Sequence, residues 1–440
     1  MSARRGRLGL DAVSLLFGLG SFTLVGCGSS SRDERTTLRF WAMGREGEVV
    51  QELVPAFEAE NPDIRVVVQQ VPWTAAHEKM LTAHVGRSTP DAAQLGNTWV
   101  AEFAALRALE SLEPWLATST VVAPDRYFSG IWDTNVIDGA PYGVPWYVDT
   151  RVLFYRKDIL ARAGYETMPE TWPEWREAMR AVKAVAGPGN FAILLPSNEW
   201  TQPVIFGLQA GSPLLSDNWT RGAFSEPEFR DAFHFYIELF REGLAPPYRN
   251  NEVANLYQEF GRGAFSMYIT GPWNLGEFRR RLPPELQDSW ATAPLPGPDA
   301  AHPGVSLAGG SSLVIFEHSK HKPEAWRLIE YLSRPEIQLR FLALTGDLPA
   351  RAEAWSDSAL TRDPHLLAFR RQLERVVATP KIPEWEMIAI ELQNRAEAVV
   401  RGVTPADSAL TSLDRYVDRA LEKRRWLVER KRTTAEAAAP

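Results

Sequence analysis

Short apolar runs rich in β-forming residues alternate with helical patterns along most of the chain. The first runs are 37–41, 64–68 and 92–95, and apolar residues at helical spacing occupy 49–57 and 74–85 between them. Alternation of this kind with short connections predicts βαβ units around a largely parallel sheet. The same pattern predicts further strands at 152–155, 191–195, 264–270, 305–308 and 313–315.

The segment 305–350 has strand-forming residues and an expected turn at Gly309–Ser312, but it is too short to build a βαβ domain of its own. We therefore expect it to return to the lobe formed by the first part of the chain. Its strands should then contact those at 38–41 and 92–95, rather than the strand at 191–195.

The N-terminal residues have the pattern of an export signal. A basic segment precedes an apolar run at 12–25 that is short for a membrane-spanning helix. The run ends in Leu24-Val-Gly-Cys27, which resembles the lipobox of bacterial lipoproteins, where the chain is cut before a cysteine that receives lipid. The resemblance implies a signal peptide at 1–26, lipid attachment at Cys27 and a tether at 27–35. An uncleaved membrane anchor is the alternative.

Composition narrows the class of protein. A chain of 440 residues with 45% hydrophobic and 23% charged residues is expected to form two lobes. The formal net charge is −7, or −9 without the basic leader, which argues against a nucleic-acid-binding face. Cys27 is the single cysteine, so no internal disulfide can form. The charge-rich tail 426–440 is expected to be disordered.

The stretch from Tyr142 to Leu160 holds candidate ligand-binding chemistry. Trp146 and Tyr147 stand next to Asp149 and Arg151, just before the apolar run 152–155. Aromatic faces beside charged hydrogen-bonding groups suit a sugar, which has an apolar CH face and a rim of hydroxyls. A buried strand followed by a polar loop is the alternative interpretation.

Two motifs carry a family resemblance. The stretch 142–160 resembles the hinge-crossing segment of extracellular solute-binding proteins of the maltose-binding type, the capture subunits of ABC importers. Gly271-Pro-Trp-Asn274 resembles a turn in which that family presents a sugar-stacking tryptophan. The resemblance extends over 36–425 and implies an α/β fold with two periplasmic-binding-protein-like lobes, discontinuous in sequence and joined by three hinge crossings.

The resemblance also implies lobe boundaries. The N-lobe would comprise 36–148 and 302–349, and the C-lobe 149–301 and 350–425. Lobes connected in this way can close on a ligand only by a hinge motion.

Ligand-binding residues are implied by position within the family pattern. Trp273 matches the stacking tryptophan, and Gly309 and Gly310 match a turn that offers backbone donors in the cleft. Glu46 lies where many members present an acidic residue. Arg351 matches the third crossing, where an arginine reaches the cleft; a surface salt bridge is the alternative.

Asn97 departs from the pattern, because the family often has an aspartate there. Asparagine offers both a donor and an acceptor to hydroxyls. The full expected ligand-binding set is Glu46, Asn97, Trp99, Trp146, Asp149, Arg151, Trp273, Gly309, Gly310 and Arg351.

Tryptophans at predicted strand ends are further candidates, because ligands of open α/β sheets bind beyond the carboxyl ends of strands. They are Trp41, Trp73, Trp99, Trp146, Trp200, Trp273 and Trp385.

These observations together indicate a lipid-anchored, extracytoplasmic, monomeric binding protein. It would capture a di- or oligosaccharide for the permease of an ABC importer on the periplasmic or cell-surface side, with no catalytic residue, cofactor, metal or nucleic acid. One alternative is a secreted carbohydrate-active enzyme using Glu46 and Asp149, which would consume an oligosaccharide that a binding protein leaves unchanged. Another is the same fold binding a glycerol-phosphate ester or other solute, for which the cleft has few basic residues.

Overall fold

A computed structural model describes residues 35–438, and the side-chain surroundings up to residue 430. The expected signal peptide, Cys27 and the tether before Arg35 lie outside the described residues. Within the described part of the chain, no helix is long and apolar enough to cross a membrane.

The first sheet contains six strands in the order β15-β6-β14-β3-β1-β2. Strands β1, β2 and β3 are parallel neighbours, as the βαβ pattern predicts. Every residue of β3 is buried, which is typical of a central strand covered on both faces. Their bounds are β1 Thr36–Met43, β2 Ile64–Val71, β3 Ala92–Gly96, β6 Val144–Asp149, β14 Gly309–Ile315 and β15 Leu348–Pro349.

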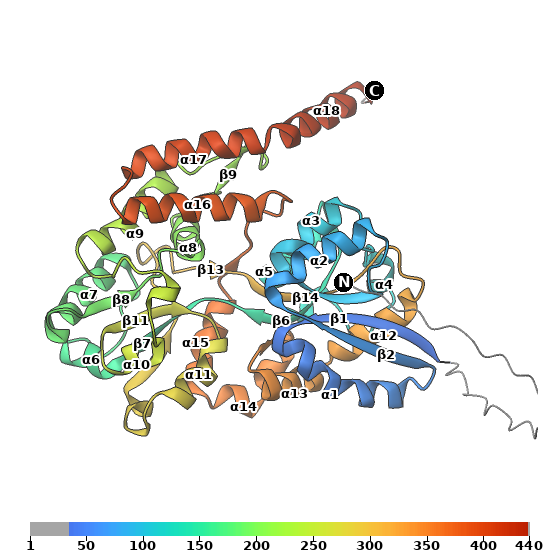
Figure 1. The fold of residues 1–440 in the computed structure, drawn as a ribbon, viewed down its shortest axis with the longest axis horizontal. Helices are drawn as coiled ribbons and strands as arrows, with labels where there is room; N and C mark the ends of the chain where they lie inside the picture. Colours follow the sequence, from blue (N-terminus) through green and yellow to red (C-terminus); the bar gives the residue numbers. More distant parts are fainter. Residues whose placement is uncertain (1–34, 439–440) are drawn as a thin grey trace, which may run out of the picture. The chain divides into compact units, whose positions relative to one another are not determined.

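Helices cover both faces of this sheet (Figure 1). Trp41 and Met43 of β1 pack on one face with residues of α2 (Trp73–Val85) and α3 (Val100–Ala105). Leu38 and Phe40 of the same strand point to the opposite face. There they pack with α1 (Gly44–Glu60), α12 (Lys322–Leu332) and α13 (Pro335–Thr345).

The second sheet has four strands in the order β12-β7-β11-β8. The chain passes from β6 to β7 through only two residues, Thr150 and Arg151. Strand β11 is parallel to β8 and antiparallel to β7, so this sheet is mixed. The bounds are β7 Val152–Arg156, β8 Phe191–Leu194, β11 Phe265–Thr270 and β12 Trp290–Ala293.

Helices of the last hundred residues pack with the second sheet and its helices. Helix α15 (Pro364–Leu373) contacts β12 and β7, and the ring of His365 stacks on Trp290 with centroids 3.8 Å apart. Helices α16 (Trp385–Val400) and α17 (Ala406–Ala420) pack on each other and on α9 (Pro227–Arg241).

The remaining elements are short or lie between those above. The other α-helices are α4 Glu113–Leu116, α5 Ser129–Asp133, α6 Lys157–Arg162, α7 Trp172–Ala186, α8 Thr201–Gln209, α10 Leu256–Gly261, α11 Trp273–Arg281, α14 Ser358–Thr361 and α18 Glu422–Ala438. The 3-10 helices are η1 Asn97–Trp99, η2 Pro124–Arg126, η3 Asn250–Glu252, η4 Pro284–Ser289 and η5 Ala352–Ser356, and the two-residue strand pairs are β4 Val136–Ile137 with β5 Ala140–Pro141, β9 Leu215–Ser216 with β10 Arg221–Gly222, and β13 Ser306–Leu307 with β16 Val376–Val377.

The returning segment joins the first sheet, as expected. Residues Ser311–Ile315 of β14 pair antiparallel with β3, and its other edge pairs with β6. Strand β1 lies one strand further away. Two details differ from the sequence expectation: Ser306–Leu307 pairs with Val376–Val377 instead of this sheet, and Gly309–Ser312 is part of β14 instead of a turn. Hydrogen bonding to β6 keeps these small residues extended.

The tail also differs from its expectation. Residues expected to be disordered from 426 onward continue the helix α18, Glu422–Ala438. The segment is rich in glutamate, lysine, arginine and alanine, which have high helix propensity even where few apolar residues are available for a core.

The close approach of β14 to β6 generates the first prediction. Gly310 has φ +124°, and a Cβ atom there would lie 2.3 Å from the carbonyl oxygen of Tyr147. At Gly309 a Cβ would instead first meet the Asp149 carboxylate oxygen, at 2.2 Å, and a side chain can move. Chemical denaturation should show Gly310→Ala losing about 2–4 kcal/mol of unfolding free energy. Gly309→Ala should lose clearly less; equal losses would contradict this account.

Candidate functional site

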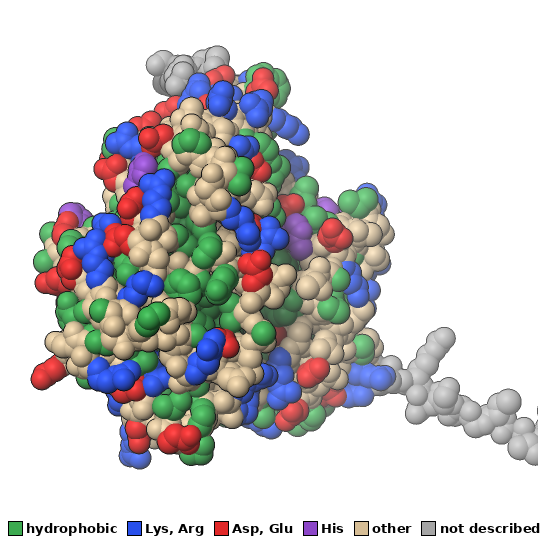
Figure 2. Space-filling model, turned by 60° about the vertical axis from the view of Figure 1, so that its left-hand side comes forward, with side chains coloured by type: hydrophobic (Ala, Val, Ile, Leu, Met, Phe, Trp, Pro, Cys, Tyr) green, Lys and Arg blue, Asp and Glu red, His purple; other side chains and the backbone are tan. Residues whose placement is uncertain are grey.

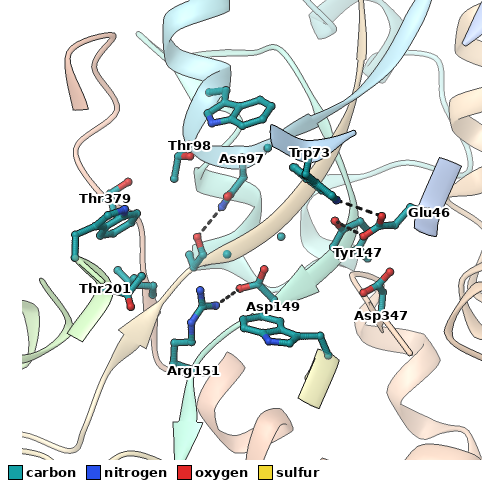
Figure 3. Close-up of a pocket in the computed structure, with 18 residues that line it drawn as sticks. Glu46, Trp73, Asn97, Thr98, Tyr147, Asp149, Arg151, Thr201, Asp347 and Thr379 are labelled. Carbon is teal, nitrogen blue, oxygen red and sulfur yellow. Dashed lines mark hydrogen bonds and ion pairs between the residues drawn. The ribbon is translucent and has the colours of Figure 1, made fainter. Parts of the chain in front are cut away.

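A cavity of about 370 Å³ lies where elements of the two sheets meet (Figure 3). This volume is within the range of small-molecule binding sites. The N-terminal part of the chain contributes the first turns after β1, β2 and β3. The later part contributes β13, the start of β14, and the segments that follow β8 and β11. Its lining comprises Glu46, Trp73, Gly96, Asn97, Thr98, Trp99, Tyr147, Asp149, Arg151, Trp200, Thr201, Trp273, Leu307, Ala308, Gly309, Gly310, Asp347 and Thr379.

Strand direction explains this grouping. Helices α1, α2, α8 and α11 and the 3-10 helix η1 each begin at or shortly after the carboxyl end of a strand. The cavity therefore lies where open α/β sheets bind ligands. Residues far apart in sequence are brought to one place by the parallel strands that precede them.

Four indole side chains line the cavity. Two of them keep a large part of their surface exposed, 38% for Trp73 and 46% for Trp273, although both are large apolar groups. Trp99 stands edge-on to Trp73 with ring centroids 5.9 Å apart, and Trp200 stands edge-on to Trp385 in the same way. Exposed aromatic faces in a concave site offer area for stacking on an amphipathic ligand.

Glu46 is held by a buried hydrogen-bond network. The Tyr147 hydroxyl donates to one Glu46 carboxylate oxygen at 3.1 Å, and the Trp73 indole N–H donates to the other at 3.4 Å. The same Tyr147 hydroxyl accepts from Gln94 at 3.1 Å and from Ser311 at 3.0 Å. Gln94 also accepts from the backbone N–H of Met43, 2.7 Å away, so β1, β3, β6 and β14 all take part in orienting one carboxylate.

Burial perturbs the titration of this part of the cavity. It raises the pKa of Glu46, although the hydrogen bonds from Tyr147 and Trp73 act in the opposite direction. It also raises the pKa of Tyr147 well above its usual range, and the nearby Glu46 charge adds to this. The pKa of Asp347 is raised to about 7 by burial first and then by the negative charges of Glu46 and Asp149. Perturbed carboxyl groups in a cavity indicate a functional site.

Asp149 and Arg151 form the opposite polar group. The Arg151 guanidinium donates to the Asp149 carboxylate at 2.8 Å and stacks over the Trp273 ring at 4.5 Å from its centroid. The Trp273 ring in turn folds over Gly271, where a Cβ atom would lie 1.9 Å from the ring. The glycine of the Gly-Pro-Trp turn is therefore required by the position of its own tryptophan.

Asn97 and the two glycines also line the cavity. The Asn97 amide donates to the carbonyl oxygen of Ala308 at 2.6 Å, which ties η1 to the returning segment. Gly309 and Gly310 line the cavity as expected. The approach of β6 requires glycine at Gly310, where the Tyr147 carbonyl oxygen takes the space of a Cβ, whereas at Gly309 that space is taken first by the movable Asp149 carboxylate.

Two of the ten expected ligand-binding residues lie elsewhere. Trp146 is 1% exposed and packs on Phe40 and Phe341, with ring centroids 6.0 and 4.5 Å away. Side chains alternate along β6, so Trp146 faces the core while its neighbours Tyr147 and Asp149 face the cavity.

Arg351 is the second of these corrections, since it is buried in the core and does not line the cavity. It is 1% exposed and donates to the carbonyl oxygens of Val121 and Ser333, each at 2.9 Å, and to the carboxylate of Glu353 at 2.7 Å. The guanidinium therefore joins three segments of the chain that are distant or separate in sequence. Buried carbonyl oxygens need donors, and these hydrogen bonds explain why the charge points inward.

Some cavity residues were missing from the expected set. Trp73 and Trp200 were among the strand-end tryptophans, so that signal located them. Trp41 and Trp385 were also strand-end candidates, but they are buried, with 8% and 0% of their surface exposed, and do not line the cavity. Tyr147 could have been found from the alternation along β6. Asp347 lies after the end of α13, where no sequence pattern marks a cavity residue; Thr98, Thr201 and Thr379 are similar cases.

The chain belongs to the family of bacterial extracellular solute-binding proteins, whose sequence profile matches residues 42–339. Among solved structures it is similar to the sugar-binding protein MalE of the phytopathogen Xanthomonas citri. The two share 52% identity with a TM-score of 0.87, over 90% of this chain and 99% of that one. The expected two-lobed, maltose-binding-type α/β fold is thereby confirmed.

Curated relatives are more distant. The diacetylchitobiose-binding protein DasA of Streptomyces coelicolor is 24% identical, over 88% of this chain and 93% of that protein. An uncharacterized lipoprotein of Streptomyces antibioticus is 26% identical, over 82% of this chain and 83% of that protein. Among the described residues, no cluster of His, Cys, Asp or Glu has the arrangement of a metal site.

Asp347 generates a pH prediction. An unfolded aspartate titrates near pH 4, whereas the folded pKa is about 7, so the folded state binds more protons between these values. The free energy of unfolding contributed by this group should fall as the pH rises through that window. Asp347→Asn, which stays uncharged, should be more stable than the natural chain at pH 8 by about 2 kcal/mol, with a smaller difference near pH 4. Urea denaturation at both pH values measures this, and an equal difference at the two would contradict it.

Proposed function

We propose that this protein is the sugar-capturing subunit of an ABC importer, with a di- or oligosaccharide bound in the cavity between its lobes. The observation that carries the proposal is the combination of exposed indole faces with oriented carboxylates in one cavity. Trp73 and Trp273 supply the faces, and Glu46, Asp149 and Asp347 supply acceptors for hydroxyl groups. The likeness to MalE and DasA supports the same class of ligand.

Ligand binding is assigned to eight of the expected residues together with newly recognised ones. Stacking is assigned to the four indoles, and hydrogen bonding to the polar groups and to the backbone at Gly309 and Gly310. The proposed set is Glu46, Trp73, Asn97, Trp99, Tyr147, Asp149, Arg151, Trp200, Trp273, Gly309, Gly310 and Asp347.

Capture is proposed to work by hinge closure. The lobes would be 36–148 with 302–349, and 149–301 with 350–425. A ligand that touches both favours the closed form by its differential affinity, and the permease recognises closure. The short β6–β7 connection at Thr150 and Arg151 and the return into β14 suit such a motion.

The alternatives receive less support from the site. A phosphate ester calls for several basic groups, whereas the cavity presents three carboxylates and one arginine that is already paired with Asp149. For a glycosidase, Glu46 would be the acid and Asp149 the nucleophile. Both carboxylates accept hydrogen bonds from the protein. Glu46 accepts from Tyr147 and Trp73, and Asp149 accepts from Arg151. This arrangement suits acceptors that are held in place to bind hydroxyl groups. We therefore propose a protein without enzymatic activity.

Attachment to a membrane through Cys27 is part of the proposal. The lipobox resemblance and the likeness to a Streptomyces lipoprotein support it. Acylation at this residue would hold a monomeric binding protein at the extracytoplasmic side of the membrane, close to its permease.

Stacking by Trp273 is tested by titration. Trp273→Ala should weaken sugar binding by about 1–3 kcal/mol in isothermal titration calorimetry, because an aromatic contact in a partly desolvated site is lost. Its unfolding free energy should change little, since the ring is half-exposed.

The matched control is Trp146→Phe, because the Trp146 ring packs in the core against Phe341. It should lower stability and leave the affinity of the folded protein nearly unchanged. A Trp273→Ala variant that loses stability but keeps its affinity for sugar would contradict the stacking role and indicate that Trp273 serves packing instead.

Lipidation is tested by fractionation. The natural chain expressed in a bacterium should sediment with membranes and carry an acylated N-terminus, detectable by mass spectrometry. Cys27→Ser cannot form the thioether and should lack that modification. An acylated N-terminus in the variant, equal to that of the natural chain, would refute the assignment.

A further inference from the structure

The last two helices carry a stripe of basic residues that the binding cavity does not explain. Helices α17 and α18 run one after the other along the edge of the described structure (Figure 1). From Arg415 to Arg432 the sequence has eight basic and three acidic residues, in a chain whose net charge is −7. This segment therefore has a charge opposite to that of the whole protein.

Helical geometry puts these residues on one face of each helix. At 100° per residue, Arg415 and Arg419 lie about 40° apart on α17, and Lys423, Trp426 and Arg430 lie within about 60° of one another on α18, which follows after Leu421. All five are exposed. The residues that α17 buries, such as Leu410, Leu413 and Val417, lie on the opposite face. We call these five residues the basic stripe.

Three of the four charged residues of the stripe are not engaged by other described residues, whereas Arg430 is. Among the described residues, neither an ion pair nor a side-chain hydrogen bond engages Arg415, Arg419 or Lys423. The acidic residues of α17 are instead used for contacts with the body of the protein. Asp414 accepts from the backbone N–H groups of Phe224 and Ser225, each at 2.8 Å.

Aromatic and apolar groups lie within or beside the stripe. Trp426 is 51% exposed and Leu427 is 45% exposed, and the Arg430 guanidinium stacks over the Trp426 ring at 4.7 Å from its centroid. The helix is fixed to the body by Arg425, which donates to the carbonyl oxygens of Thr220 and Asp418 at 2.9 and 3.1 Å. The stripe is thus presented outward from a held helix, and Lys and Arg side chains gather at the top of Figure 2, where α17 and α18 lie.

We propose that the basic stripe is a docking surface for the anionic phospholipid headgroups of a bilayer. Basic side chains near an anionic membrane are attracted to its surface, and tryptophan beside them suits the boundary between headgroups and acyl chains. An acidic partner protein would also pair with the basic residues. It would not explain why the exposed side chains of Trp426 and Leu427 lie among them. The proposal rests on the proposed membrane-side location, since the lipid anchor would keep this surface near a bilayer.

Vesicle sedimentation tests the proposal without the anchor. A chain lacking residues 1–27 retains the unit that begins at Thr36, so binding then depends on the folded protein alone. It should bind vesicles of phosphatidylcholine mixed with phosphatidylglycerol and not vesicles of phosphatidylcholine only. Added salt should weaken binding, because it screens exposed charges.

The decisive variant combines Arg415→Glu, Arg419→Glu and Lys423→Glu, and should lower binding to the mixed vesicles by about tenfold or more. A matched control with the same charge change is Lys157→Glu, Arg162→Glu and Arg340→Glu, at exposed positions away from α17 and α18. It should bind nearly as the natural sequence does. Trp426→Ala should weaken binding with the charges intact.

Outcomes that overturn the proposal are equally definite. They are failure of the natural sequence to bind mixed vesicles, equal binding by the two triple variants, or equal binding to vesicles with and without phosphatidylglycerol. Sugar affinity measured on the same samples reports folding of each variant. A result on lipid vesicles is therefore distinguishable from a failure of the proposed sugar-binding function.

Discussion

The close antiparallel packing of β14 on β6 is the contact on which the cavity depends. It brings a segment from beyond residue 300 against the strand that leads into the second sheet, and Gly310 permits an approach that a side chain there would prevent. The same pairing places Ser311 within hydrogen-bond distance of Tyr147, which in turn holds Glu46. The backbone pairing of β14 with β6 therefore also sets the orientation of the Glu46 carboxylate in the cavity.

The tryptophans show how one residue type serves two purposes. Trp146 and Trp385 are enclosed by other apolar groups, whereas Trp73 and Trp273 keep exposed faces in the cavity. The difference comes from position: Trp146 and Trp385 pack in core clusters, although Trp385 begins α16, whereas Trp73 and Trp273 begin α2 and α11 just after the ends of β2 and β11. An aromatic residue stays available to a ligand only where the fold places nothing over it.

Charge is distributed as unevenly as the aromatic residues. Carboxylates gather in the cavity, where burial and mutual repulsion raise the pKa of Asp347 to about 7. Arg415, Arg419 and Lys423, which have no acidic partner among the described residues, lie exposed on α17 and α18. The net charge of −7 shows neither the acidic cavity nor the basic helices. It is a sum over the whole chain, whereas a ligand or a surface contacts only one of these regions.

The sequence by itself determined the fold class and most of the element order, and it pointed to eight residues that line the cavity. Local periodicity and strand-end positions suffice for these, because they depend on neighbours in the chain. Only the tertiary structure decided that Arg351 and Trp146 belong to the core, that Asp347 joins the cavity and that Gly309–Ser312 extends a strand. Each of these outcomes depends on a partner distant in sequence, such as Val121 for Arg351 or β6 for Gly310, and no local pattern records such a partner.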